Sequence, residues 1–115
     1  MFVGVSSLPL VQCCTPIAEA ISDADARDLE RVFKALADRH RVKILAALAR
    51  AGGEAVCVCD FAELLGVPQP NASYHLKQLL DAGLLERSKR GSYAYYALAD
   101  GALERVGALL TAEAA

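Results

Sequence analysis

The chain has 115 residues, 55% of them hydrophobic and 23% charged, which is enough for one domain with one apolar core and excludes disorder by composition. Its formal net charge of −2 argues against indiscriminate binding to polyanions, although charge gathered on one face would still permit specific binding to DNA. The sequence has no run of 18 apolar residues. We therefore expect a cytoplasmic protein with no membrane partner.

The first residues are predicted to form an arm. Met1 to Val11 is apolar but lacks Lys and Arg, and Gln12 is not the small residue that a lipoprotein signal places before its cysteine. We interpret residues 1–22 as an arm bearing the pair Cys13-Cys14, followed by a folded domain over residues 23–115.

Apolar residues three and four positions apart predict three helices in the first half of the chain. The first has Ser22 or Asp23 as its cap, and the second follows Asp38 and ends at residues 52–53. Residues 55–58 are short and β-prone. A third helix is expected to open at Cys59-Asp60 and to stop at residues 66–68.

The second half predicts another helix, a hairpin and a last helix. The fourth helix begins near Gln69 and ends at Gly83, two strands cover residues 84–90 and 93–98, and Asp100 starts the last helix. The order α-α-α-α-β-β-α, with the N-terminal arm before it, predicts a mainly α (α+β) winged helix-turn-helix. The first and last helices carry apolar stripes without an obvious partner, which predicts a homodimer.

One face of the fourth helix and the tip of the hairpin carry polar and basic residues that can read base edges or hold phosphates of double-stranded DNA. Residues 71–98 hold four Lys or Arg against two Asp or Glu. For any single residue of this face, simple solvation is an equally good explanation, and His75 suits packing or phosphate contact better than metal ligation. The candidate DNA-binding residues are Gln69, Asn71, Ser73, Tyr74, His75, Lys77, Gln78, Lys89 and Arg90.

The stretches FKALADRHRVKILAAL (33–48) and CVCDFAELLGVPQPNASYHLKQLLDAGLLERSKRGSYAYYAL (57–98) resemble the ArsR family of metal-sensing winged-helix repressors. The resemblance covers about residues 29–98. It implies an obligate dimer joined by the first and last helices, a recognition helix at about residues 69–82, and loss of DNA binding when an ion binds.

The chain departs from the family pattern in two places. The last helix contains no His, so the family's zinc site on that helix is expected to be absent. The third cysteine of the arsenic-sensing triad follows the Cys-Val-Cys pair by three residues in the family, and this position is Ala62 here. The local helix therefore cannot supply three sulfurs, and we expect Cys13, Cys14 or both to complete any such site.

Four thiols in two tight clusters, Cys13-Cys14 and Cys57-Val58-Cys59, point to soft-ion chemistry in a reducing compartment. Cys59 lies near a helix N-terminus, whose dipole should lower the pKa of its thiol. As(III) and Sb(III) take three sulfurs, whereas Cd(II) and Pb(II) accept three or four. Zinc is a weaker option because no His is positioned to help. Either cluster alone could be incidental.

These observations predict a transcriptional repressor that binds operator DNA as a homodimer and is released when As(III) or Sb(III) binds to the metal-site candidates Cys13, Cys14, Cys57 and Cys59. The alternatives are a Cd(II)- or Pb(II)-responsive repressor of the same fold and a repressor switched by a thiol-disulfide change. An enzyme is not expected, because the chain lacks the C-x-x-C spacing, a βαβ pattern and an acid-base constellation. No organic cofactor is expected.

Overall fold

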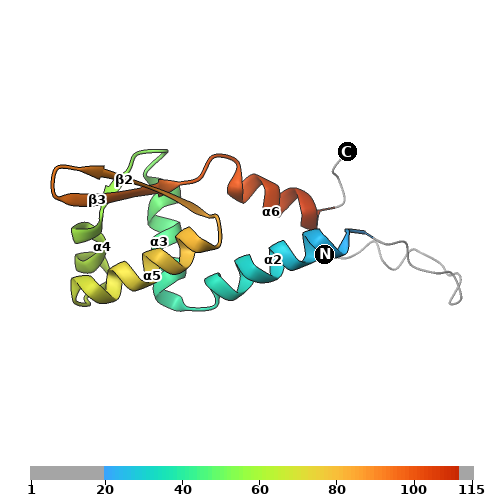
Figure 1. Ribbon diagram of the computed structural model, residues 1–115, viewed down its shortest axis with the longest axis horizontal. Helices are drawn as coiled ribbons and strands as arrows, with labels where there is room; N and C mark the ends of the chain where they lie inside the picture. Colours follow the sequence, from blue (N-terminus) through green and yellow to red (C-terminus); the bar gives the residue numbers. More distant parts are fainter. Residues whose placement is uncertain (1–19, 112–115) are drawn as a thin grey trace, which may run out of the picture.

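Five helices and three strands form the part of the chain that the computed structural model describes, residues 20–111. The elements are α2 (Asp23–Leu36), α3 (Arg39–Arg50), β1 (Val56–Cys57), α4 (Val58–Leu65), α5 (Gln69–Asp81), β2 (Leu85–Arg90), β3 (Tyr93–Leu98) and α6 (Ala102–Leu110). This order confirms the predicted winged helix-turn-helix (Figure 1). The division at residue 22 between arm and domain stays a prediction, since residues 1–19 lie outside the described part.

The first two helices begin where the sequence predicts. The Ser22 hydroxyl accepts a hydrogen bond from the backbone N–H of Asp25 at 3.0 Å. The Asp38 carboxylate accepts from the N–H groups of His40 and Arg41 at 2.8 and 3.3 Å. Both caps satisfy donors that a helix N-terminus leaves free, so short-range chemistry sets these boundaries.

Two predicted helix starts were wrong by one or two residues. α4 begins at Val58 rather than Cys59, because the extended Cys57 acts as the cap and its sulfur accepts the N–H of Cys59 at 3.4 Å. α6 begins at Ala102 rather than Asp100. Gly101 precedes it in the left-handed conformation, with φ of 72°, and this conformation separates Asp100 from the helix.

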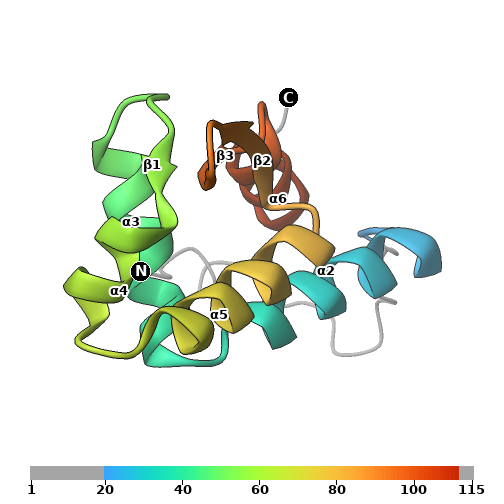
Figure 2. The ribbon, with the colours of Figure 1, turned by 60° about the vertical axis from the view of Figure 1, so that its left-hand side comes forward.

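A tight turn at Gly66 joins α4 to α5. Gly66 has φ of 68°, and its N–H and that of Val67 both donate to the carbonyl of Ala62. The left-handed glycine ends α4 without steric cost, and Pro70 in the first turn of α5 lacks an N–H that the helix would leave free anyway. The two helices of the helix-turn-helix are thereby set at a fixed angle (Figure 2).

The three strands form one antiparallel sheet in the order β1-β3-β2. β2 and β3 make the hairpin, from the pair Leu85 and Leu98 to the pair Arg90 and Tyr93. The β-prone segment after α3 becomes the two-residue strand β1, in which Cys57 pairs with Tyr95. The segment that carries two of the cysteines is therefore hydrogen-bonded to the wing.

The core lies where α3, α4, α5 and the start of the hairpin meet. Its largest fully buried side chains are Phe61, Ile44, Leu48, Leu76, Leu79 and Leu84. α2 and α6 lie side by side away from this centre, joined by ion pairs from Arg105 to Asp25 and Asp28 (Figure 1). Within residues 20–111, no helix is long and apolar enough to cross a membrane.

Candidate nucleic-acid interface and thiol pair

α5 buries one face and presents the other. Ala72, Leu76 and Leu79 are fully inaccessible to solvent, which fixes the rotation of the helix about its axis. The predicted DNA-binding residues of α5 lie outside this buried strip: Gln69, Asn71, Tyr74 and Lys77 are exposed, and Ser73, His75 and Gln78 are half-buried.

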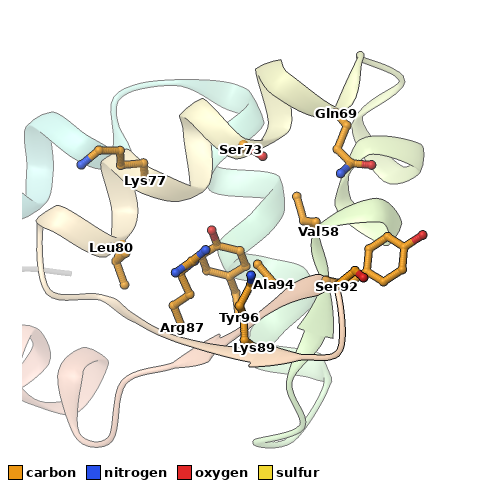
Figure 3. Close-up of a pocket in the computed structure, with 11 residues that line it drawn as sticks. Val58, Gln69, Ser73, Lys77, Leu80, Arg87, Lys89, Ser92, Ala94 and Tyr96 are labelled. Carbon is orange, nitrogen blue, oxygen red and sulfur yellow. The ribbon is translucent and has the colours of Figure 1, made fainter.

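A cleft of about 590 Å³ separates α5 from the hairpin (Figure 3). Gln69, Ser73 and Lys77, which are four residues apart, come from α5, and Arg87 and Lys89 come from β2. The other lining residues are Val58, Leu80, Ser92, Tyr93, Ala94 and Tyr96. None of these lining residues is acidic, and three are cationic. The cleft therefore has the charge and the donors that a phosphate backbone requires.

The hairpin separates the two basic residues that the sequence places together at its tip. Lys89 lines the cleft, whereas the Arg90 guanidinium lies over the ring of Tyr95, 4.6 Å from its centroid. Successive side chains of a strand point to opposite faces, so Arg87 shares the face of Lys89. Sequence reasoning missed Arg87, although this alternation, counted back from Lys89, would have identified it.

Lys77 is free to change partners. Its ammonium lies 3.0 Å from a carboxylate oxygen of Asp81, one turn later on α5, and both side chains are mostly exposed. Exposed pairs of this spacing contribute only about 0.3–0.5 kcal/mol, so a phosphate could replace the carboxylate at little cost.

His75 faces α3 rather than the cleft. Arg41 donates a hydrogen bond from its guanidinium to Nδ1 of His75 at 3.1 Å. Burial lowers the pKa of His75, and the charges of Arg41 and His40 lower it further, while Asp38 opposes them. The neutral form of His75 is therefore favoured where its ring meets α3.

Cys57 and Cys59 form a thiol pair at the start of α4, with their sulfur atoms 2.6 Å apart. Cys57 is buried and Cys59 is exposed. A single soft ion with bonds to sulfur of about 2.3 Å can contact both sulfurs only if they move further apart than they are here. Cys13 and Cys14 lie outside the described residues. Within residues 20–111 no group of three His, Cys, Asp or Glu side chains could hold a metal, so this pair is at most part of a site.

The net shift of the Cys59 pKa is opposite to the lowering expected from the sequence. The pKa of the Cys59 thiol is raised, first by its hydrogen bond with the Cys57 thiol and then by partial desolvation and the nearby charges of Cys57 and Asp60. The backbone hydrogen bond at Cys59 acts the other way but is weaker. An ion that binds here must therefore displace protons, which makes its affinity dependent on pH.

Comparison with known proteins gives a consistent family. Residues 38–87 match the model of a protein family described as "Bacterial regulatory protein, arsR family". The chain is 45% identical over 87 residues to the arsenical resistance operon repressor of Bacillus subtilis, which covers 76% of this chain and 78% of that protein. It is 41% identical over 73 residues to a cadmium resistance transcriptional regulatory protein CadC homolog of Staphylococcus aureus, covering 64% and 59%.

Among solved structures, this chain resembles a regulator from Mycobacterium bovis and the repressor AntR. The homodimeric winged helix-turn-helix DNA-binding domain of a possible ArsR-family regulator from Mycobacterium bovis has a TM-score of 0.63 at 34% identity, covering 77% of this chain and 82% of that one. The AntR antimony-specific transcriptional repressor has a TM-score of 0.64 at 29% identity, covering 87% and 89%.

Removing a cation from the cleft should weaken DNA binding. We expect Lys77→Ala and Arg87→Ala each to lower affinity and to reduce the slope of log affinity against log salt concentration by about one, the value for one lost phosphate contact. Fluorescence anisotropy on a duplex selected from random sequence measures both. Arg27→Ala, in an exposed ion pair on α2, is the matched control. Unchanged slopes in both cleft variants would contradict the assignment.

Removing the Cys57 thiol should make Cys59 more acidic, because the hydrogen bond from Cys57 is the largest cause of the raised pKa. In a Cys13→Ser, Cys14→Ser background, Cys57→Ala should shift the pH profile of iodoacetamide alkylation at Cys59 to lower pH. At neutral pH alkylation then becomes faster. Val56→Ala, which leaves both thiols in place, serves as the control for local packing, and equal profiles in the two variants would refute the thiol–thiol interaction.

Proposed function

The chain belongs to the ArsR family of bacterial regulatory proteins, and from this premise we propose that it represses transcription by binding operator DNA as a homodimer and that As(III) or Sb(III) releases it. Membership of this family makes the chain a transcriptional regulator rather than an enzyme. We place its activity in the cytoplasm, where DNA and reduced thiols are both present.

The cationic cleft between α5 and the hairpin is the observation that carries the proposal. α5 supplies polar side chains at the spacing of one helical face, and β2 supplies Arg87 and Lys89 opposite them. A helix in the major groove with a basic hairpin beside it accounts for the polar face of α5 and for the two cations of β2. Base edges are then read by α5, and the hairpin holds the backbone.

A second copy of the chain would cover the apolar surface of α2 and α6. No residue of α6 is buried in the described part of one chain, and Phe33 and Leu110 are 45% and 58% exposed. The M. bovis relative described as homodimeric supports this arrangement. A dimer presents two α5 helices, which must lie about 34–36 Å apart to enter successive major grooves.

The thiol pair of α4 supplies two of the sulfurs that a trigonal As(III) or Sb(III) site needs. The position one turn after Cys59 is Ala62, so the third sulfur must come from Cys13 or Cys14 on the arm, of the same or the partner subunit. The relatives named for arsenical and antimony repression favour this ion class. The relative named as a cadmium resistance regulator leaves Cd(II) or Pb(II) as alternative ions. The two sulfurs of α4 lie 2.6 Å apart, which leaves a thiol-redox switch as a further alternative.

Two contacts connect the thiol pair to the DNA-facing cleft. Cys57 pairs with Tyr95, whose ring lies under Arg90, and the adjacent Val58 lines the cleft itself. An ion that draws Cys57 and Cys59 toward the arm thus acts on the hairpin and on the cleft. A coupling of about 1–3 kcal/mol corresponds to a change of roughly 5–150-fold in DNA affinity, which is sufficient for a switch.

Charging the surface of α2 and α6 should produce monomers. Phe33→Asp with Leu110→Asp places two carboxylates on side chains that are exposed within one chain, so the fold of the monomer should survive while association is lost. Sedimentation at micromolar concentration measures the mass. Leu64→Asp, on the equally exposed Leu64 of α4, should remain dimeric. A monomeric wild type would refute the proposed assembly.

Removing the arm cysteines should abolish the response to arsenite. Cys13→Ser with Cys14→Ser should leave DNA affinity unchanged and lose arsenite-induced release, because serine oxygen is a hard and weak donor. Arsenite stoichiometry on the reduced protein and release of bound DNA are measured together, with Cd(II) and a thiol oxidant as parallel inducers. Release that survives in this variant would exclude an arm-plus-helix site.

A mixed dimer decides whether the site crosses subunits. One chain carries the Cys13→Ser, Cys14→Ser changes and its partner carries Cys57→Ser and Cys59→Ser. A site between subunits leaves one working arsenite site in this dimer, whereas a site within one chain leaves none.

A further inference from the structure

A polar contact outside the cleft joins α5 to the rest of the fold. The Arg41 guanidinium, on α3, donates to Nδ1 of His75, on α5, at 3.1 Å. Within residues 20–111 this is the one side-chain hydrogen bond that links α5 to another helix. Against α3, α5 otherwise packs through buried apolar side chains and through the tilted contact between the His75 and His40 rings.

Arg41 is itself held at several points. Its Nε donates to the carbonyl of Ala35 at 2.6 Å, in the last turn of α2, where helix carbonyls lack internal partners. Its backbone N–H donates to the Asp38 carboxylate that caps α3. The guanidinium is a rigid planar fork, so these contacts fix the direction from which it meets His75.

The chemistry of the contact fixes the tautomer of His75. A guanidinium carries five N–H donors and no acceptor, so Nδ1 of His75 must be unprotonated and the ring proton must lie on Nε2. Asp38, the N-cap residue of α3, and His40 on α3 also act on this ring, and the ring of Tyr74 on α5 lies 5.4 Å from it. The His40 ring lies 5.2 Å from the His75 ring, and its buried Nδ1 has no partner in the described residues, so Arg41 is hydrogen-bonded to His75 and not to His40.

We propose that Arg41 is a positioning residue for DNA recognition: its guanidinium holds His75 as the Nε2–H tautomer and thereby sets the orientation of α5 against α2 and α3. Protonation of Nδ1 would break the contact and place two cations side by side. The effect on DNA rests on the proposed function, whereas the contact and the tautomer do not.

Arg41→Lys tests the proposal while keeping the charge. Lysine presents one ammonium in place of the fork and cannot bridge Ala35 and His75 in the same geometry. Arg39→Lys is the matched control, since it makes the same change two residues earlier on α3 at an exposed side chain with no side-chain hydrogen bond in the described part. Thermal unfolding and sedimentation check that both variants fold and associate.

Two readouts are expected to move together. Ring ¹⁵N–¹H NMR at about pH 8, above the ordinary pKa of histidine, should show His75 with its proton on Nε2 alone in the wild type and in Arg39→Lys, and Arg41→Lys should show a mixture of tautomers. DNA affinity for the selected duplex should fall about threefold to tenfold in Arg41→Lys, the range for one hydrogen bond, with an unchanged salt slope. Arg39→Lys should stay within about twofold.

Three results would overturn the proposal. A proton on Nδ1 in the wild type would exclude the contact, and equal affinities of the two lysine variants would exclude a positioning role. A salt slope reduced by about one in Arg41→Lys would make Arg41 a phosphate contact instead. If the wild type binds no duplex, the proposed function fails, and the NMR readout still decides whether Arg41 sets the tautomer.

Discussion

The burial of one face of α5 is the constraint on which the other features of this protein depend. Ala72, Leu76 and Leu79 are wholly enclosed by the side chains of α3, α4 and the hairpin, so α5 cannot rotate without exposing apolar area. Because the buried strip is fixed, Lys77 must border the hairpin, and His75 must border α3. The cleft and the contact with Arg41 are the two flanks of one packed helix.

The distribution of charge explains how an acidic chain can offer a basic cleft. On α2 the basic side chains pair with acids of the same helix, as in Arg27 with Asp23 and Lys34 with Glu30. No ion pair within residues 20–111 involves Arg87 or Lys89, and Lys77 has only an exposed pair. The cations that line the cleft are thus unpaired or only weakly paired in the described part, which leaves them available to phosphates.

Local features could be read from the sequence, and features that depend on distant neighbours could not. The caps Ser22 and Asp38 depend on residues within one turn, and both were among the predicted caps. The direction of the Cys59 pKa shift was mispredicted because its largest cause is the hydrogen bond with the Cys57 thiol, which outweighs the backbone hydrogen bond that acts the other way. The contact of Arg41 with His75 joins positions 34 residues apart and required the tertiary structure.

The alternation of side chains along β2 constrains how the length of the hairpin can change. Leu85 is buried in the core, and Arg87 and Lys89 follow it on the same face. Inserting or deleting one residue between Leu85 and Arg87 would turn the two cations away from α5 and bring the opposite face inward. Changes of two residues preserve the face. The segment from Leu85 to Lys89 can therefore change in length only in steps of two, a parity rule that no single substitution in β2 would reveal.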